Sequence, residues 1–268
     1  MPKISNIIEV KNLTYKNILQ NINLVIPKGK YIAISGTNSA GKTTLIKLLS
    51  TTLTIKDCIF FKQKKIEEIN KKTIFQEIGL IFPEEKQKFI NATVEEEIFY
   101  ILENTNMEQK KKIEKYQKII KMINIENILT KNPNELTHIN YIKLLLATAL
   151  ISTPSILLTD NICSNLTKKE RKELLEILKL LNKEEKLTII MATNNLEEVL
   201  EANYLYILNK GKIAMEGTPL EVLKQDNKLN KLGLELPLMV DLSVKLHDYD
   251  LLKDIIIDMD RMVDTLWK

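Results

Sequence analysis

Cysteines and long apolar runs are scarce in this sequence. The two cysteines, Cys58 and Cys163, stand far apart among 268 residues. This spacing argues against a disulfide framework or a zinc site and favours a reducing compartment. The longest apolar stretch, residues 144–151, is too short to cross a bilayer, and residues 1–10 lack the apolar segment of a signal peptide. We therefore expect a chain that is soluble by itself and reaches a membrane only through a partner.

A strong charge imbalance is also missing. The net charge is +4, and lysines alternate with glutamates along the chain, so we expect no nucleic-acid partner. Hydrophobic residues make up 44% of the chain and charged residues 28%, as is ordinary for a soluble globular protein. The length suggests one or two domains.

Short apolar runs recur along the chain and predict its strands. Apolar residues alternate over residues 8–13 and 22–26, a period of two that predicts a pair of antiparallel strands. Further strands are predicted at residues 31–35, 58–61, 78–82, 155–159, 188–192 and 204–208. Several of these runs are continuously apolar and separated by predicted helices, as buried parallel strands require.

Two parts of the chain are predicted to be helical throughout. Residues 84–151 carry an almost wholly helical pattern between predicted strands, which suggests a helical subdomain that stands off the sheet. After about residue 225 the strand patterns stop, and the remaining residues predict a small helical appendix. A further helix is predicted at residues 43–53, directly after a glycine-containing loop.

That loop, residues 36–44, reads GTNSAGKTT and matches G-x-x-x-x-G-K-[ST] in full. Between a strand and a helix, its backbone N–H groups point at phosphate oxygens, and its two glycines permit a close approach. Lys42 supplies a charge for the β- and γ-phosphates, and the Thr43 hydroxyl supplies a ligand for Mg²⁺. The predicted nucleotide-binding residues here are Gly36, Thr37, Asn38, Ser39, Ala40, Gly41, Lys42, Thr43 and Thr44.

Other stretches extend this pattern into a family resemblance. Residues 91–100 read NATVEEEIFY, residues 157–160 read LLTD, and residues 209–219 read NKGKIAMEGTP. Together with the phosphate loop they resemble an ATP-binding-cassette (ABC) ATPase subunit over nearly the whole chain and in the family's order. The resemblance implies ATP and Mg²⁺ as cofactors and Asp160 as a second Mg²⁺ ligand. It also implies that Tyr15 stacks on the adenine, although Tyr15 could instead pack on the edge of the sheet.

The resemblance implies an α/β fold, the P-loop NTPase ABC cassette. We expect an N-terminal antiparallel β subdomain, an inserted α-helical subdomain at about residues 84–151, and a small helical C-terminal extension. The ATPase domain would cover residues 1–225 and the extension residues 226–268. Within the extension, residues 232–246 and 255–268 resemble the C-terminal part of ATPases from energy-coupling-factor (ECF) importers, where it helps to pair two ATPase subunits.

Four positions depart from the family's hydrolysis pattern. Asn161 stands where the family has a glutamate that polarises the attacking water, and Asn194 stands where it has a histidine that contacts the γ-phosphate. Pro83 replaces a glutamine, and Thr167 replaces an aspartate. An amide cannot accept a proton, and loss of a positioned base typically costs about 10²–10⁴ in rate. We therefore predict no intact catalytic residue and weak or absent hydrolysis.

The family's signature motif, Leu-Ser-Gly-Gly-Gln, is also altered. Here it reads Leu136, Thr137, His138, Ile139 and Asn140. In an ABC dimer this segment faces the partner's ATP, so we expect the two larger side chains to hinder the close approach of the backbone, and a β-branched isoleucine to resist a glycine conformation. We expect a helix from residue 141 onward and assign no catalytic role to the histidine.

The favoured function is an ATP-binding subunit of an ECF-type importer that binds MgATP and couples closure of the dimer to transport. It would work on the cytoplasmic face of the plasma membrane, beside a more complete ABC ATPase subunit, a membrane-embedded coupling protein and a substrate-binding membrane component. A heterodimer is expected because two identical chains would lack any intact hydrolysis site. By resemblance, residues 83–94 would lie near the membrane protein.

Two alternatives remain open on the sequence. The chain could be an active ATPase in which another acid, such as Asp57 or Glu84, replaces the missing base. It could also be a scaffold that binds no nucleotide. Phosphate release that depends on Lys42 identifies the first alternative, and the lack of any MgATP-dependent rise in melting temperature identifies the second.

Overall fold

Two β-sheets organise the chain in the computed structural model, which describes residues 5–83, 89–257 and 259–267. A six-stranded sheet has the order β10-β9-β3-β8-β7-β6, and a four-stranded sheet has the order β2-β1-β4-β5. The strands of the larger sheet are β3 (Tyr31–Ser35), β6 (Ile78–Ile81), β7 (Ile156–Asp160), β8 (Thr188–Thr193), β9 (Tyr204–Asn209) and β10 (Lys212–Gly217). Those of the smaller sheet are β1 (Asn6–Tyr15), β2 (Leu19–Pro27), β4 (Ile59–Phe61) and β5 (Lys64–Lys65).

Helices cover the larger sheet and extend the molecule at both ends. The α-helices are α1 (Lys42–Leu49), α2 (Lys71–Glu77), α3 (Val94–Glu103), α4 (Gln109–Ile123), α5 (His138–Ile151), α6 (Lys168–Glu184), α7 (Pro219–Leu223), α8 (Asp226–Lys231), α9 (Leu238–Asp248) and α10 (Met259–Leu266). Short 3₁₀ helices are η1 (Ile66–Glu68), η2 (Glu126–Ile128), η3 (Pro133–Glu135) and η4 (Leu196–Val199). None of the helices in the described part of the chain is long and apolar enough to cross a membrane.

Parallel strands form the middle of the larger sheet, as the continuous apolar runs predict. β3 lies between β8 and β9 and runs parallel to both, and β7 runs parallel to β6 and β8. Every residue of β3, β7 and β8 is buried, because helices pack on both faces of the sheet. β10 is antiparallel to β9 at the edge, and the apolar pattern did not predict it because its side chains are alternately exposed.

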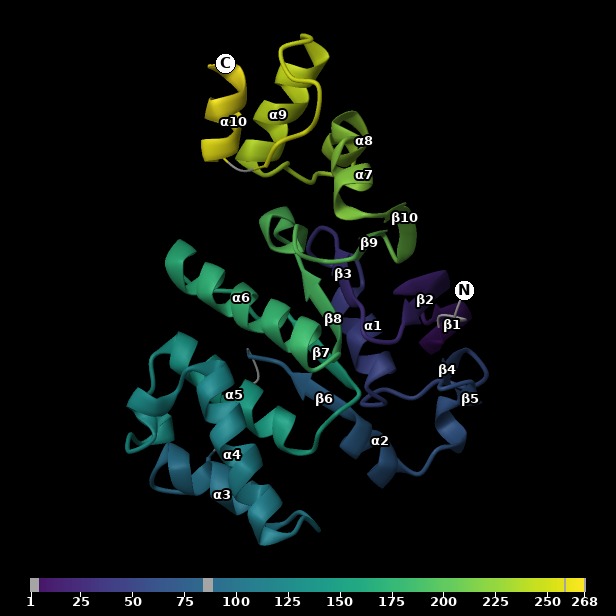
Figure 1. The fold of residues 1–268 in the computed structure, drawn as a ribbon. Coiled ribbons are helices and arrows are strands. Elements are labelled where there is room, and N and C mark those ends of the chain that lie inside the picture. Colours follow the sequence, from purple (N-terminus) through teal and green to yellow (C-terminus); the bar gives the residue numbers. More distant parts are fainter. Residues whose placement is uncertain (1–4, 84–88, 258, 268) are drawn as a thin grey trace.

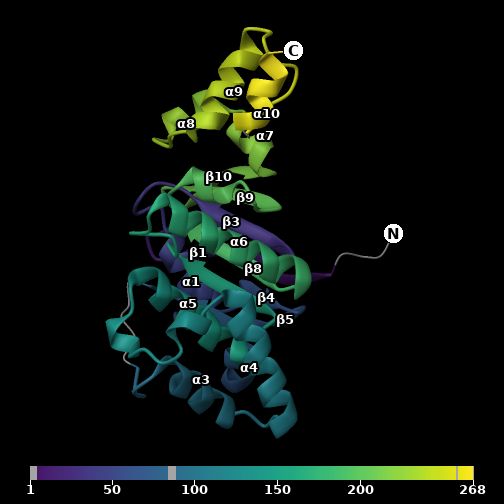
Figure 2. The same ribbon diagram turned by 60° about the vertical axis from the view of Figure 1, so that its left-hand side comes forward.

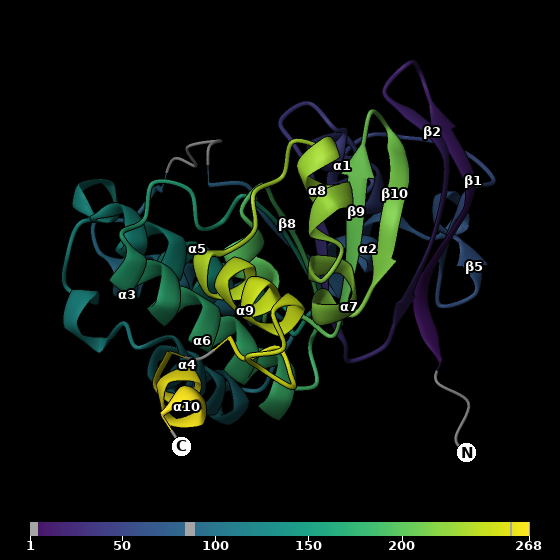
Figure 3. The ribbon, with the colours of Figure 1, turned by 90° about the horizontal axis from the view of Figure 1, so that it is seen from above.

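The predicted antiparallel pair is confirmed. Ile8 lies opposite Ile26, and Val10 lies opposite Leu24, so the apolar side chains of β1 and β2 meet on one face of the smaller sheet. β4, predicted from residues 58–61, pairs antiparallel with β1 and belongs to this sheet instead of the parallel one. Figure 3 shows β1 and β2 on the side of the molecule opposite α3.

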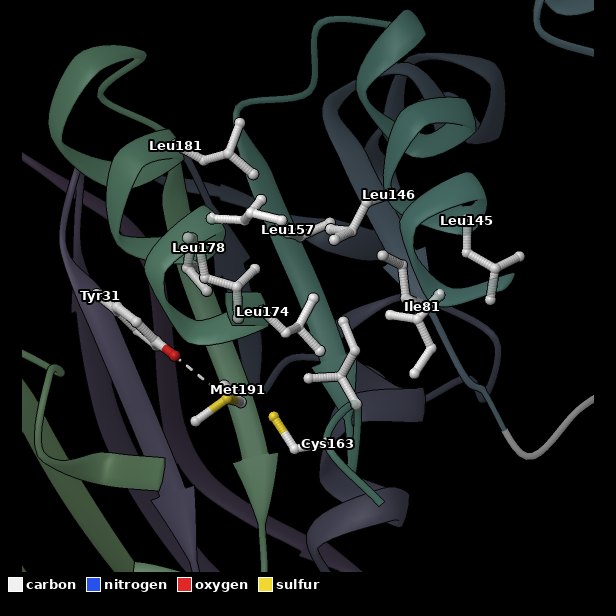
Figure 4. Close-up of a cluster of buried hydrophobic side chains, with 14 of the residues drawn as sticks. Tyr31, Ile81, Leu145, Leu146, Leu157, Cys163, Leu174, Leu178, Leu181 and Met191 are labelled. Carbon is white, nitrogen blue, oxygen red and sulfur yellow. Dashed lines mark hydrogen bonds between the residues drawn. The ribbon is translucent and has the colours of Figure 1, made fainter. Parts of the chain in front are cut away.

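Alternation along the central strands divides the core into two layers. On one face Tyr31, Leu157 and Met191 pack with α6 and the helical block, and on the other face Ile32 and Ile190 pack with α1 and the smaller sheet. Figure 4 shows the first layer, where the Tyr31 hydroxyl donates to the sulfur of Met191 at 3.2 Å. Each strand can fill both layers because its successive side chains point to opposite faces.

The predicted helical block is present as α3, α4 and α5, which lie on the opposite side of the larger sheet from the C-terminal helices (Figures 1 and 2). α3 begins with a capping box between Thr93 and Glu96, which satisfies N–H groups that the first turn leaves free. The helix predicted at residues 43–53 is shorter, because α1 ends at Leu49 and Thr51 has a φ of 60°. The boundaries of the predicted domains stay predictions.

The C-terminal helices form the expected appendix. Leu229, Leu234 and Val240 join the main core, whereas Leu252, Ile256 and Met262 form a small cluster of their own. The appendix is therefore anchored to the main core through its first half and carries a separate small core in its second half.

Candidate functional site

The loop between β3 and α1 has a backbone that demands glycine at both ends. Gly36 has a φ of 152°, and a Cβ placed on it would lie 2.1 Å from the carbonyl oxygen of Leu208. Gly41 has a φ of 105°, and its Cβ would lie 2.7 Å from a methyl carbon of Leu19. Since a side chain at either position would both strain and collide, the bend of this loop depends on the two glycines that the motif supplies.

Lys42 closes the loop from within. Its Nζ donates to the carbonyl oxygens of Gly36 at 2.7 Å and Thr37 at 2.9 Å, and only 6% of the residue is exposed. Burial lowers the pKa of Lys42, and the nearby charge of Asp160 opposes that change. A phosphate group would compensate the buried ammonium, since a buried charge requires an opposite partner.

Thr43 and Asp160 bring two hard oxygen ligands together. The Thr43 hydroxyl donates to Oδ2 of Asp160 at 2.5 Å, although 117 residues separate them in the chain. Thr43 lies in the first turn of α1, and Asp160 ends β7, so both stand at the carboxyl edge of the parallel strands. Oxygen ligands of this kind suit Mg²⁺, which usually keeps waters and takes one or two carboxylates together with substrate phosphates. Among the described residues no cluster of three or more His, Cys, Asp and Glu could hold a metal ion.

A pocket opens over the loop and contains most of the predicted nucleotide-binding residues. Its lining comprises Ile18, Asn38, Ser39, Ala40, Gly41, Lys42, Thr43, Thr44 and Asn161. Gly36 and Thr37 contribute to the site instead through their carbonyl oxygens, which accept hydrogen bonds from Lys42. Ile18 was not predicted, because nothing in the sequence distinguishes a hydrophobic residue in a short turn from a packing residue. Ile18 lies in the turn between β1 and β2, where its N–H donates to the carbonyl oxygen of Tyr15 at 3.1 Å.

Tyr15 ends β1 and is half-buried, and it does not line this pocket. The ammonium of Lys16 lies 5.3 Å from the centre of its ring, within the range of a cation–π contact. The predicted stacking on adenine therefore stays a prediction.

Asn161 lies at the wall of the pocket, directly after Asp160. It has a left-handed backbone with a φ of 48°, which asparagine tolerates better than most residues. Its N–H donates to the carbonyl of Ala192 at 2.9 Å, while its side-chain oxygen is buried without a hydrogen-bond partner in the described part of the chain. The position predicted to lack the catalytic base thus lines the pocket at the phosphate loop with an amide, which cannot accept the proton of a water.

Asn194 reaches the same loop from the next strand. Its side-chain nitrogen donates to Oδ1 of Asn38 at 3.2 Å. The preceding Thr193 is buried and donates to Glu198 at 2.5 Å, and Arg171 of α6 lies 3.5 Å from that carboxylate. Burial raises the pKa of Glu198. These contacts fix the end of β8, so the asparagine is held where it can bond the loop.

Of the two acids considered as substitute bases, Asp57 does not line the pocket. Asp57 is exposed and pairs with Lys65, whose hydrogen bond and charge lower the pKa of the aspartate. Glu84 lies outside the described residues. Pro83 is buried and follows β6. It lies at the same edge of the sheet as Asn161 and Asn194, which follow the parallel strands β7 and β8.

The altered signature segment differs from the expectation in two ways. α5 begins at His138 instead of residue 141, so His138, Ile139 and Asn140 form its first turn after the exposed Thr137 and the half-buried Leu136. Ile139 has no left-handed backbone, so no glycine conformation is required of it. Its side chain is only 8% exposed and packs in the main core, so it does not project toward a partner.

His138 has a contact inside the fold. Its Nε2 lies 3.0 Å from the carbonyl oxygen of Ser164, in the loop after β7. This contact ties the start of α5 to the segment that follows Asp160 and Asn161. Thr167, at the other end of that segment, caps α6 in a capping box with Glu170, and these hydrogen bonds lower the pKa of the glutamate. His138 and Thr167 therefore have structural partners, although the family has other residue types at these positions.

Comparison with known proteins agrees with this geometry. The family model described as ABC transporter matches residues 19–164. The energy-coupling factor transporter ATP-binding protein EcfA of Pediococcus pentosaceus is 30% identical over 87% of this chain and 86% of that protein. EcfA1 of Geobacillus kaustophilus is 28% identical over 93% of this chain and 90% of that protein.

A solved structure shows the same fold. It is cbiO1 from Clostridium perfringens, described as part of the ABC transporter complex cbiONQ, and it superposes with a TM-score of 0.77 at 24% identity over 91% of this chain and 99% of that one. The fold is that of the ABC-cassette P-loop NTPases. With the complete phosphate loop and the aspartate at the end of β7 in place, this chain belongs to the ABC transporter family, among relatives named as ATP-binding proteins of energy-coupling-factor transporters.

Proposed function

We propose that this chain is the ATP-binding subunit of an ECF-type ABC importer that holds MgATP and hydrolyses it weakly or not at all. The single observation that carries the proposal is the contrast within one pocket. Lys42, Thr43 and Asp160 are arranged to bind, whereas Asn161 stands where a base would be needed. Binding and hydrolysis are thus separated at adjacent residues.

The binding half of the proposal follows from the phosphate loop. Backbone N–H groups at the start of α1 and the buried ammonium of Lys42 attract the β- and γ-phosphates. Thr43 and Asp160 would hold Mg²⁺, which neutralises charge on the phosphate oxygens when it is bound. Asn38 and Asn194 already bond each other at 3.2 Å, so their amides would add polar contacts near the terminal phosphate.

The hydrolysis half follows from the chemistry of the replaced side chains. The amide of Asn161 can accept a hydrogen bond from water but cannot take up its proton at neutral pH. Asn194 likewise lacks an ionisable ring. Because a general base contributes typically about 10²–10⁴ to the rate, turnover at this site would be slow.

The proposed partners follow from the same deficits. Two copies of this chain would place an amide at each base position and a histidine-isoleucine pair at each signature position, so a second, more complete ABC ATPase would supply the working half of the dimer. A membrane-embedded coupling protein and a substrate-binding membrane component would complete the importer, with this chain on the cytoplasmic face of the membrane. Ile90, in the segment expected to meet the membrane protein, is 80% exposed, which supports a contact there.

Incubation of excess chain with γ-labelled ATP and Mg²⁺ tests both halves. Bound ATP is separated from released phosphate, and Lys42→Ala is treated in parallel. Retention of intact ATP by the unaltered chain, lost in the variant, supports the proposal. Phosphate release that depends on Lys42 would contradict weak hydrolysis. If ATP is neither retained nor hydrolysed, that result would contradict nucleotide binding and favour a scaffold.

A further inference from the structure

A second pocket lies away from the phosphate loop, where the helical block meets the sheet layer. It is formed by α4, the end of α5 with the loop after it, and the end of α6 with the loop that leads to β8. Its volume of about 400 Å³ falls within the range of small-molecule sites. The apolar part of its wall includes Met107, Ile119, Met122, Leu150, Leu181 and Leu187.

Three lysines of α4 border this pocket. Lys111, Lys115 and Lys118 are spaced by four and three residues, which places them on one side of the helix. Lys118 pairs with Glu185 at 2.5 Å, and Lys111 pairs with Glu108 at 3.5 Å. Two of the three cations therefore have carboxylate partners already.

Lys115 differs from its neighbours. Its Nζ donates to the hydroxyl of Thr153 at 2.5 Å, and no carboxylate of the described residues lies within ion-pair distance of it. Burial, together with the charge of Lys118, lowers the pKa of Lys115 to about 8, against an opposing effect of Glu185. This amine thus carries a charge that is partly removed from water and that a neutral hydroxyl compensates only in part.

We propose that this pocket binds a small amphiphile with a single negative charge, such as an aliphatic carboxylate. Its head group pairs with Lys115 beside Thr153, and its chain packs on the apolar wall. This site is separate from the nucleotide site and goes beyond the proposed function.

The charges around the pocket favour a single negative charge over several. Glu114 and Glu185 line it, and the C-terminal ends of α5 and α6, which carry partial negative charge, point toward it through Thr153 and Glu185. A nucleotide or polyphosphate would meet repulsion from these groups. A monoanion needs only the ammonium of Lys115, which has no carboxylate partner among the described residues, and gains most of its affinity from apolar contact.

An occupant would join two parts of the fold. Its chain would contact α4 on one side and α6 on the other, so it would link the helical block to the helix that packs on the sheet. A ligand that binds only the folded chain raises its melting temperature. Binding should therefore appear both as heat in a titration and as thermal stabilisation.

The test titrates decanoate into the full chain by calorimetry and measures the melting temperature beside it. We expect saturable binding that weakens at least about tenfold in Lys115→Met, because a hydrogen bond to a charged group is lost, and that persists in Lys115→Arg. Lys121→Met, on an exposed turn of the same helix, is the matched control and should bind as the unaltered chain does. Decanamide, which has no charge, should bind the unaltered chain as weakly as decanoate binds Lys115→Met.

A pH series adds a readout that loss of packing would not move. The carboxylate stays ionised above pH 6, whereas Lys115 becomes neutral as the pH rises through about 8, so affinity should be steady below that value and fall above it. The other charged groups that face this amine are Lys111, Glu114 and Lys118 of α4 and Glu185 after α6. The fall should be absent in Lys115→Met.

Three results would overturn the proposal: no saturable binding of decanoate, equal affinity in Lys115→Met and the unaltered chain, or equal affinity for decanamide and decanoate. Lys42→Ala should bind decanoate normally even though it fails to hold ATP. That variant separates a failure here from a failure of the proposed nucleotide function.

Discussion

The phosphate loop, residues 36–44, and the altered signature segment, residues 136–140, both lead into a helix, but they hold their positions differently. In the loop, glycines permit a bend that no other residue could take, and the side chains of Lys42 and Thr43 turn inward to bond the loop and Asp160. In the segment, Ile139 is buried in the core and His138 bonds a neighbouring carbonyl. The loop lines a pocket that can receive a ligand, whereas the side chains of the segment pack against and bond to other parts of the chain.

This difference separates residues that line a ligand pocket from residues that mainly support the fold. Residues of the loop bond one another through Lys42, and most of them also line the pocket in which a phosphate would bind. Of the positions that depart from the family's pattern, Thr167 has partners inside the fold because it caps α6, whereas Asn161 lines the pocket. A substitution of Lys42 should therefore change ligand binding, whereas substitutions of Ile139, His138 or Thr167 should mainly change stability.

The largest effect is expected from Lys42→Ala. Because a charge-assisted contact to phosphate is lost, the affinity for MgATP should fall at least about 100-fold. The rise of the melting temperature with MgATP measures this directly. Lys30→Ala, an exposed lysine outside the pocket, should keep the full rise. An equal rise in melting temperature in both variants would contradict the role of Lys42 in nucleotide binding.

Ile139→Ala should lower the free energy of unfolding by about 2–3 kcal/mol, because a buried isoleucine leaves a cavity in the core. His138→Ala, which removes one hydrogen bond at the half-buried edge, should cost about 1 kcal/mol. Urea denaturation of the two variants compares them. The opposite order would mean that the isoleucine is not the core residue that its 8% exposure indicates.

Asn161→Glu should raise phosphate release about tenfold under single-turnover conditions, since a carboxylate can accept the proton of the attacking water. The gain is smaller than a full base contribution because Asn194, Pro83 and the signature segment stay altered. Asn161→Gln keeps the length of the glutamate without its basicity and should show no gain. Equal rates of phosphate release in the two variants would show that the lack of a carboxylate at position 161 does not limit hydrolysis.

Thr167→Ala should have the smallest effect, a loss of about 1 kcal/mol of stability, because an N-cap and its capping box are removed. The MgATP-dependent rise in melting temperature should be unchanged. Lys168→Ala, at the next and exposed position of the helix, controls for the substitution itself. A weaker MgATP response in Thr167→Ala alone would mean that this residue serves the nucleotide and not only the helix.

Much of the site was predictable because the chemistry of phosphate binding is local. A strand, two glycines five positions apart in the motif, a lysine and a threonine specify the loop within nine residues, and the structure places that loop between β3 and α1. The pairing of Thr43 with Asp160 was predicted only through the family resemblance, since 117 residues separate the two.

Other features depended on contacts between distant segments. Ile18 reaches the pocket because the turn after β1 folds over Gly41, and no periodicity indicates this. The burial of Ile139 and the contact of His138 with Ser164 were not predicted for the same reason, since both arise only when α5 packs beside the loop after β7. β10 was missed because an edge strand lacks the apolar run that burial on both faces imposes.

The sequence by itself determined the phosphate-loop motif, the buried parallel strands and the presence of an asparagine directly after Asp160, because each depends on residue types within a few positions. Only the tertiary structure decided which side chains line the pocket, which replaced residues became part of the core, and where Lys115 lies without a carboxylate partner among the described residues. The physical reason is that burial and pairing are properties of surfaces that meet in space, and a single chain segment does not contain both surfaces.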